Sequence, residues 1–341
     1  MLRIVGIKAD KDEGRAAAIG NSHQFVVFGL DPDNPQHLRV PEKKFLPLPP
    51  AAIPSRLQLQ YKGEMIETAL QRAPAAPLLL ARLGQFEVRL AATPAERHAA
   101  FRLRYEVFHR ERGVDAPSMD HAEHVEADAF DPFCDHIIVI DTRARTLGDA
   151  PAIVGTYRAM RSPAPGLGWY ADTEFDLSNL FARHPDLRFC EVGRSCVAPS
   201  YRSMRTIEAL WCGLWAYACR NGIDAYFGAA SFPGTDPAAH GLALSHLYQT
   251  ARAPEEWSAT ARPGNALPMN RLETVDRHAA LRAMPPLVRG YLRVNAVFGD
   301  TAYVDRAFGT TDVFVLARFA AAPLAYRRRV ERVTGLRHPG L

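Results

Sequence analysis

Residues 189–224, which read FCEVGRSCVAPSYRSMRTIEALWCGLWAYACRNGID, decide the fold class. Phe189 to Val197 predicts a strand, and Ser203 supplies a capping hydroxyl just before a long helix. The helix is expected to end at Gly222. Its apolar side chains recur every three or four residues and form one stripe, expected to lie in the core: Ile207, Leu210, Trp211, Leu214, Trp215 and Ala218. With a further strand at 225–232, this pattern indicates an α/β domain.

Apolar periodicity predicts further elements on both sides of this segment. A strand is expected at 85–90, followed by a helix that begins with the capping box Thr93-Pro-Ala-Glu96 and ends near Gly113. Helices and strands that alternate in this way predict a mixed sheet covered by helices. The remaining predicted elements are strands at 136–141, 152–162 and 313–319 and a helical stretch at 237–248.

Composition narrows the class of protein. The chain has 341 residues, 48% hydrophobic and 23% charged, with a formal net charge of +4, which excludes a mostly disordered protein. Its five cysteines include no CxxC pair, which argues against a disulfide framework or a zinc knuckle. The mild positive charge predicts no nucleic-acid partner. Neither a signal segment nor a membrane-spanning stretch is recognisable, so we expect a cytoplasmic protein.

Several familiar kinds of catalytic site find no support in the sequence. Ser231 lies in GAASFPG (228–234), whose spacing differs from the GxSxG motif of serine hydrolases, and no glycine-rich nucleotide-binding pattern occurs. Cys190 and Cys196 are expected to be small core residues, since neither has an obvious base beside it. Four potential metal ligands match no zinc-binding spacing, so no metal site is expected: His121, His124, Cys134 and His136.

Charged residues recur at strand positions that should be interior. Burying an unpaired charge is costly, so such residues are either paired or functional. Glu191 and Arg194 are three residues apart and would face opposite sides of a regular strand. A β-bulge at Gly193 would bring both to one face, and bulges recur beside active sites. The alternative is a purely stabilising network of arginine and acidic side chains across two strands.

An ordered set of motifs carries a resemblance to a known family. The motifs are LRYEVFHRERG (103–113), DAFDPFCDHIIVID (128–141), IVGTYR (153–158), FCEVGRSCVAPSYR (189–202) and RTIEALWCGLWAYACRNGID (205–224). Together they resemble the GNAT-related N-acyltransferases of ornithine lipid synthesis, which are similar in turn to acyl-homoserine-lactone synthases. Three segments resemble the ornithine branch in particular: PPLVRGYLR (285–293), DRAF (305–308) and TDVF (311–314).

The resemblance implies a fold and a division of the chain. The expected fold is α/β, with a GNAT-like mixed, mostly antiparallel central sheet flanked by helices. This acyltransferase domain is expected over residues 83–325. A weakly structured extension over residues 1–82 would precede it, and a basic tail over residues 326–341 would follow.

The resemblance also implies a reaction. A 3-hydroxyacyl chain would pass from acyl carrier protein to the α-amino group of L-ornithine, giving lyso-ornithine lipid. An amine must lose its proton before it attacks a thioester, and Glu191 matches the strand glutamate that has this role in the lactone synthases. The backbone around Gly193 would stabilise the developing oxyanion.

The remaining charged residues match the needs of a diamino acid. Arg158 and Arg194 would bind the carboxylate of ornithine through paired hydrogen bonds, and Asp128 or Asp131 would bind its second, cationic amine. Arg104 matches a helix arginine of the family that orders the acidic loop, although a solvated helix residue is the equally simple alternative.

The segment before the long helix bears on the acyl donor. GNAT enzymes that use coenzyme A carry a glycine-rich loop for its pyrophosphate, whereas residues 201–207 read YRSMRTI. Arg202, Ser203 and Arg205 would bind the single phosphate of a phosphopantetheine arm, which favours acyl carrier protein over free acyl-CoA. No bound cofactor is expected. Six arginines from Arg318 onward would favour an anionic membrane surface or an acidic carrier protein.

Two other functions remain open from the sequence. A lactone-type or other long-chain N-acyl amino acid synthase would use the same sheet with a different amine, such as S-adenosylmethionine. A non-catalytic module that binds anionic lipid or carrier protein would keep its binding after Glu191→Ala, whereas either enzyme would lose turnover.

Overall fold

The computed structural model describes residues 6–7, 16–21, 24–31, 34–39, 78–144 and 151–341, and the chain divides into two compact units between residues 64 and 65. The first unit contains an antiparallel sheet in the order β1-β2-β3-β4, so the expected weakly structured extension includes four strands. Alanine and glycine in β2 carry little strand propensity, which explains why the sequence signal was weak. The strands are β1 (Gly6–Ile7), β2 (Ala16–Asn21), β3 (Gln24–Asp31) and β4 (Asn34–Arg39).

The second unit is built on a nine-stranded sheet in the order β15-β16-β17-β13-β12-β10-β9-β6-β5. Neighbouring strands are antiparallel except β12 and β13, which are parallel. The predicted mixed, mostly antiparallel GNAT-like sheet is therefore confirmed. Its strands are β5 (Leu79–Leu83), β6 (Phe86–Leu90), β9 (Asp135–Asp141), β10 (Ile153–Met160), β12 (Phe189–Val197), β13 (Ala225–Pro233), β15 (Ala266–Pro268), β16 (Val297–Asp305) and β17 (Thr310–Arg318).

Helices cover both faces of this sheet. Thr93 forms the predicted capping box with Glu96 at the start of α2, and Ser203 caps α4, which ends at Gly222 in the left-handed conformation. No helix within the described residues is long and apolar enough to cross a bilayer. The helices are α2 (Pro94–Tyr105) with its π-helical extension η2 (Glu106–Glu111), α3 (Ser178–Arg183), α4 (Met204–Asn221), α5 (Gly241–Ala251), α6 (Arg277–Ala283), α7 (Pro286–Arg293) and α8 (Leu324–Thr334).

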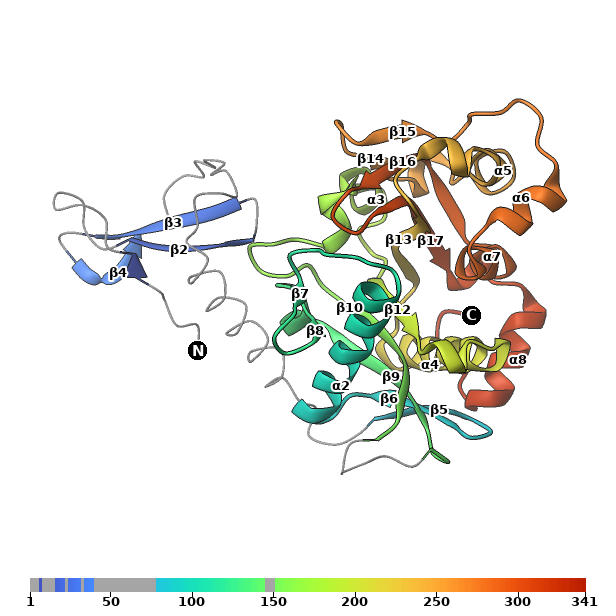
Figure 1. Cartoon of the computed structure of the whole chain (residues 1–341), viewed down its shortest axis with the longest axis horizontal. Helices are drawn as coiled ribbons and strands as arrows, with labels where there is room; N and C mark the ends of the chain where they lie inside the picture. The colour runs from blue at the N-terminus through green and yellow to red at the C-terminus, as the bar shows by residue number, and fades with distance from the viewer. Residues whose placement is uncertain (1–5, 8–15, 22–23, 32–33, 40–77, 145–150) are drawn as a thin grey trace. The chain divides into compact units, whose positions relative to one another are not determined.

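The two faces of the sheet have different covers. On β9, Ile137 and Val139 pack with α4, whereas Ile138 and Ile140 pack with Ala100 of α2, and alternate residues of a strand point to opposite faces. Figure 1 shows α2 over the strands β9 and β10, with α4 and α8 next to each other. Trp215 of the predicted apolar stripe is buried, as expected for a core helix.

The parallel pair β12–β13 separates soon after it forms. Pairing covers only Phe189↔Ala225, Cys190↔Tyr226 and Glu191↔Phe227, although both strands continue. At the point of separation a Cβ on Gly228 would lie 2.4 Å from the carbonyl oxygen of Val192, so only glycine permits this close approach. The separation puts Glu191 at the last paired position, beside an opening in the ladder.

The two ends of the domain differ from the sequence prediction. The first strand, β5, begins at Leu79, four residues before the expected boundary at 83, because its apolar residues do not alternate clearly with polar ones. The expected basic tail is not a separate segment: α8 packs on α4, and Val330 and His338 are buried. Trp215 Nε1 donates a hydrogen bond to the carbonyl oxygen of Leu336 at 3.0 Å. A count of arginines does not detect this apolar side of the segment.

Candidate active site

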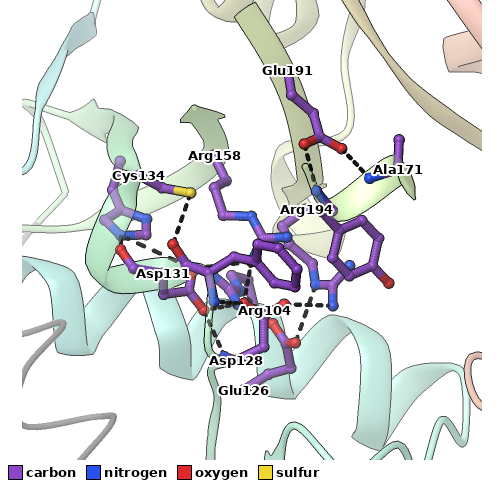
Figure 2. A network of polar contacts seen from close by, with 12 residues as sticks. Arg104, Glu126, Asp128, Asp131, Cys134, Arg158, Ala171, Glu191 and Arg194 are labelled. Atoms are coloured by element: carbon purple, nitrogen blue, oxygen red, sulfur yellow. Dashed lines mark hydrogen bonds and ion pairs between the residues drawn. The ribbon is translucent and has the colours of Figure 1, made fainter. Parts of the chain in front are cut away.

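Glu191 lies at the centre of the candidate site and is 5% exposed. Its carboxylate accepts hydrogen bonds from the backbone N–H groups of Tyr170 (2.8 Å) and Ala171 (2.7 Å) (Figure 2). Burial raises the pKa of Glu191 to about 7, even though Arg158 and the two backbone donors act in the opposite direction. A carboxylate with this pKa is suited to accept a proton near neutral pH.

A β-bulge follows Glu191, as the sequence predicted, but it lies one residue later than Gly193. Thr156 pairs with Cys196 and Arg158 with Gly193, so β12 has one more residue than β10 between these pairs. Arg194 has a φ of 52°, a left-handed conformation that is uncommon for a residue other than glycine. The guanidinium carbon of Arg194 lies 4.5 Å from the centroid of the Tyr170 ring, so Glu191 and Arg194 both contact Tyr170.

Three arginines and three acids form a buried group that we call the paired network (Figure 2). Arg104 Nη1 and Nη2 donate to the two carboxylate oxygens of Asp131 at 2.8 and 2.9 Å, and Arg104 also pairs with Glu126. This arrangement contradicts a solvated Arg104, which is 1% exposed. The members of the network are Arg104, Arg158, Arg194, Glu126, Asp128 and Asp131.

The other two arginines tie the acidic loop to the sheet. Arg158 Nη1 on β10 lies 2.6 Å from Asp128 and 3.3 Å from Asp131. Arg194 on β12 contacts Glu126 through Nε (3.1 Å) and Asp128 through Nη2 (3.0 Å). The structure thus brings together the five charged residues that the sequence selected around Glu191, but it pairs the arginines with the aspartates.

Charge compensation lowers the pKa of two acids of the network, Asp131 and Glu126. Burial alone would raise the pKa of Asp131, but Arg104 and Arg158 outweigh it and hold the pKa below its ordinary range. Burial lowers the pKa of His136, beside Asp131, to about 4, so this histidine is neutral at pH 7. The stabilising network that the sequence left as an alternative is present, and it surrounds the candidate base.

The residues expected to bind the donor phosphate lie at the start of α4. Ser203 accepts a hydrogen bond from the backbone N–H of Thr206 as the N-cap. Arg202 is exposed and pairs with Glu111 through both Nη1 (2.6 Å) and Nη2 (2.5 Å), and Arg205 is also exposed. These three residues are adjacent in sequence, and none belongs to the paired network.

A small apolar cavity of about 60 Å³ lies on the sheet face that α4 covers. A cavity of this size is smaller than one that holds a benzene ring, so a long acyl chain would enter only if side chains moved. Tyr157 and Tyr291 contribute a hydroxyl pair 2.5 Å apart at its wall. The remaining lining includes Val192, Trp211, Trp215 and Tyr226.

Sequence reasoning missed three parts of the site. Tyr170 acts through its backbone N–H, for which the side-chain pattern gives no signal. Glu126 stands in the acidic run that was recognised, but only Asp128 and Asp131 were selected from that run. A cluster of carboxylates also went unnoticed because its members come from distant segments: Glu174, Asp305 and Asp312.

The cysteines and histidines considered for a metal site lie in different surroundings. Cys134 Sγ donates to the carbonyl oxygen of Phe130 at 3.1 Å, and burial raises its pKa. His121 lies near the surface, where its ring contacts Tyr105 and Asp115. Cys190 and Cys196 are buried, as expected for core residues.

Comparison with known proteins assigns the family. Residues 103–212 match the sequence pattern described as the acetyltransferase (GNAT) domain. The chain is 45% identical over 258 residues to L-ornithine N(alpha)-acyltransferase of Brucella abortus (strain 2308), a match that covers 74% of this chain and 92% of that protein. The chain belongs to the L-ornithine N(alpha)-acyltransferase family. It is therefore an acyltransferase of the GNAT fold.

A second member of the L-ornithine N(alpha)-acyltransferase family is similar in sequence to this chain, and solved structures of two synthases also align with it. The protein of Rhizobium meliloti (strain 1021) is 44% identical, covering 72% of this chain and 85% of its own. Among solved structures, FeeM, an N-acyl amino acid synthase from uncultured soil microbes, aligns at 11% identity with a TM-score of 0.42, over 72% of this chain and 98% of its own. The CoA-dependent acyl-homoserine lactone synthase MesI aligns at 15% identity with a TM-score of 0.37, over 71% and 88%.

Proposed function

We propose that this acyltransferase moves a 3-hydroxyacyl chain from acyl carrier protein to the α-amino group of L-ornithine and so forms lyso-ornithine lipid. The observation that carries the proposal is Glu191, a buried carboxylate with a pKa of about 7 beside the opening between β12 and β13. The names of the relatives support ornithine as the acceptor.

The reaction needs one proton acceptor and one donor to an oxyanion. Glu191 takes a proton from the α-ammonium, and the nitrogen lone pair then attacks the thioester carbon to form the new C–N bond. The carbonyl oxygen becomes an oxyanion, for which backbone N–H groups at the bulge of β12 are the proposed donors. The nitrogen, which carries two hydrogens after the attack, loses one of them to solvent, and collapse of the intermediate breaks the C–S bond. The sulfur leaves as a thiol after it receives from Glu191 the proton that the ammonium gave up.

Binding of the acceptor's carboxylate is the proposed role of Arg158 and Arg194. Both ion pairs of Arg158 are made by Nη1, and Arg194 pairs through Nε and Nη2. A carboxylate would therefore contact Nη2 of Arg158 and Nη1 of Arg194. The acids of the network hold both guanidinium groups in place for this contact.

The proposal that acyl carrier protein is the acyl donor rests on positively charged residues at the surface. Arg202 and Arg205 are exposed at the start of α4, near the strongly exposed Met204. These cations match an acidic carrier protein and the phosphate of its pantetheine arm, which would be a substrate and not a resident cofactor. The arginines of α8 would attract an anionic membrane, so peripheral membrane contact is part of the proposal.

The test uses the purified chain, 3-hydroxyacyl carrier protein and a panel of amines: ornithine, lysine, glutamine, glycine and S-adenosylmethionine. Release of the carrier thiol and the product mass are measured. Release with ornithine, a mass equal to one amide-linked acyl chain, and loss of both in Glu191→Gln are expected. A lactone product from S-adenosylmethionine would favour the lactone-type synthase. No release from carrier protein or acyl-CoA with any amine would contradict the proposal and favour a binding module.

A further inference from the structure

A second acidic group on the same side of the molecule has no arginine partner. Glu174 follows the short helix Tyr170–Thr173, Asp305 ends β16 and Asp312 lies on β17. One carboxylate oxygen from each of the three lies within 4.8 Å of the other two. We call these residues the acidic cluster.

The acidic cluster contains buried oxygens that no protein group satisfies. Glu174 and Asp312 are each 3% exposed, and neither Glu174 Oε2 nor Asp312 Oδ1 has a hydrogen-bond partner. In the described part of the chain, no lysine, arginine or histidine forms an ion pair with a member of the cluster. An orphaned buried carboxylate is costly unless a cation binds to it.

The acidic cluster shares the sheet face of the candidate base. Phe189, Phe227 and Phe314 belong to one core group on that face. Glu191 is two residues from Phe189 and Asp312 is two residues from Phe314, so both acids point to the same side. The strand β13 lies between β12 and β17, and it parts from β12 beyond Glu191.

The loop that holds Glu191 also links it to the acidic cluster. Tyr170 donates its backbone N–H to Glu191, and Glu174 is four residues further along the chain. Glu174 and Glu191 are close enough for the charge of Glu191 to raise the pKa of Glu174. Arg194, which stacks on Tyr170, lowers the pKa of both Glu174 and Asp312. Its ion pairs, however, are with Glu126 and Asp128.

One edge of the acidic cluster lies at the surface. Asp305 is only half-buried, and Ser231, which faces Asp312 across the β13–β17 ladder, is exposed. Asp305 Oδ1 accepts the backbone N–H groups of Ala307 and Phe308, which fixes its position at the start of the β16–β17 turn. Thr310 Oγ1 donates to Asp312 Oδ2 at 3.1 Å, leaving Oδ1 for a ligand.

The oxygens of the acidic cluster, all within 4.8 Å of one another, are close enough to share one ammonium group. A tetrahedral ammonium that donates three hydrogen bonds of about 2.8 Å places its acceptors about 4.6 Å apart. The α- and δ-nitrogens of extended ornithine are five bonds, or roughly 6 Å, apart, so one molecule can present one nitrogen to Glu191 and the other to a neighbouring group. By contrast, Asp128 and Asp131, expected from the sequence to bind this second amine, are already paired with arginines.

We propose that Glu174, Asp305 and Asp312 bind the side-chain ammonium of the acceptor and so select a diamino acid over amino acids with apolar side chains. This inference rests on the proposed function, because it takes an amino acid as the acceptor. The cluster supplies specificity, whereas Glu191 supplies the base. A polar pocket of this kind rejects an analogue without the matching group much more strongly than an apolar pocket rejects a change in size.

The test compares ornithine with norvaline, which has the same carbon chain and no side-chain amine. Dissociation constants are measured by calorimetry, and kcat/KM is measured with 3-hydroxyacyl carrier protein. The wild type is expected to prefer ornithine at least about 100-fold. Asp312→Asn and Glu174→Gln are each expected to weaken the binding of ornithine, and to lower its kcat/KM, about 10- to 100-fold. The same two values for norvaline should stay within about threefold of the wild type. Glu273→Gln removes an exposed acid and should change neither value.

Several outcomes would overturn the inference. Equal binding of ornithine and norvaline by the wild type would do so without any variant. Equal losses for both amino acids in the variants would reveal a structural role, and activity that EDTA removes and Mg²⁺ or Ca²⁺ restores through these residues would reveal a metal site. Preferential ornithine binding that depends on Asp312, without acyl transfer to any amine, would contradict the proposed function but support the cluster. Equal turnover of ornithine and norvaline would support the proposed acyl transfer but contradict the role of the acidic cluster.

Discussion

The paired network and the acidic cluster lie on the same side of one sheet but treat buried charge in opposite ways. In the paired network each acid contacts at least one arginine. In the acidic cluster two carboxylates have orphaned oxygens, and burial raises the pKa of both Glu174 and Asp312. Glu191 stands between these extremes, since two backbone N–H groups satisfy it and its pKa is about 7.

The comparison teaches that burial of charge does not by itself indicate function. Charges that compensate each other hold the acidic loop against the sheet. A buried charge without a partner lowers the stability of the folded protein until a ligand of opposite charge binds, so such charges indicate where that ligand binds. The two groups should therefore respond differently to mutation and to pH.

The largest effect is expected where compensation in the paired network is broken. Asp131→Asn leaves Arg104 and Arg158 without a buried carboxylate that both now contact. The free energy of unfolding should fall by about 3 to 5 kcal/mol, measured by urea denaturation. Glu273→Gln, on the surface, should change it by less than about 0.5 kcal/mol. A loss below 1 kcal/mol for Asp131→Asn would mean that the network does not hold the fold together.

The contribution of the acidic cluster to stability should depend on pH in the opposite way to that of the paired network. Burial raises the pKa of Asp312 to about 7, with Asp305 and Glu174 nearby and Arg194 and the Ser231 hydroxyl opposing the shift. The folded protein therefore binds this proton more tightly than the unfolded chain, and the stabilisation present below about pH 4 is lost as the pH rises through 7.

Urea denaturation of the ligand-free protein between pH 4 and 8 measures this effect. The wild type should lose on the order of 2 to 4 kcal/mol through Asp312 over this range, and Asp312→Asn should lack that part of the loss. Asp131, whose pKa is lowered, instead loses its contribution as the pH falls below about 4. Parallel stability curves for the wild type and Asp312→Asn would contradict the difference between the two groups.

The smallest effect is expected outside both groups. The Arg202–Glu111 pair is partly exposed, with 40% and 34% of the two side chains accessible, so breaking it should cost at most about 1 kcal/mol. If Arg202 also binds the donor phosphate, Arg202→Gln should raise the KM for the acyl carrier protein about three- to tenfold. Glu111→Gln breaks the same pair but keeps the arginine, so it should not raise the KM. Equal changes in KM would remove Arg202 from the donor site.

Most of the fold could be predicted because its signals are local. The capping residues Thr93 and Ser203 and the apolar stripe of α4 lie within single segments, where spacing and side-chain type are sufficient. The C-terminal helix α8 was expected as a basic tail because its apolar residues become informative only when α4 packs against them. Strand β16 was missed because its apolar residues are interrupted by Gly299 and Asp300.

The site could be predicted only in part, for a related reason. Glu191, Arg194 and the bulge of β12 are neighbours in one strand, so the sequence brought them together and placed the bulge within one residue. Pairing between Arg158 and Asp128 depends on the path of the loop in space. The acidic cluster joins residues up to 138 positions apart, Glu174 and Asp312, and no spacing rule connects them.

The pH dependence of kcat with saturating ornithine and 3-hydroxyacyl carrier protein tests the central role of Glu191 most directly. Because the base must be ionised, the wild-type kcat should fall about tenfold per pH unit on the acid side of a single inflection, the pKa of Glu191 in the substrate complex, and level off above it. Glu191→Gln should lower kcat at least about 100-fold and abolish this inflection. A Glu191→Gln variant that keeps the wild-type kcat and the same inflection would contradict the account.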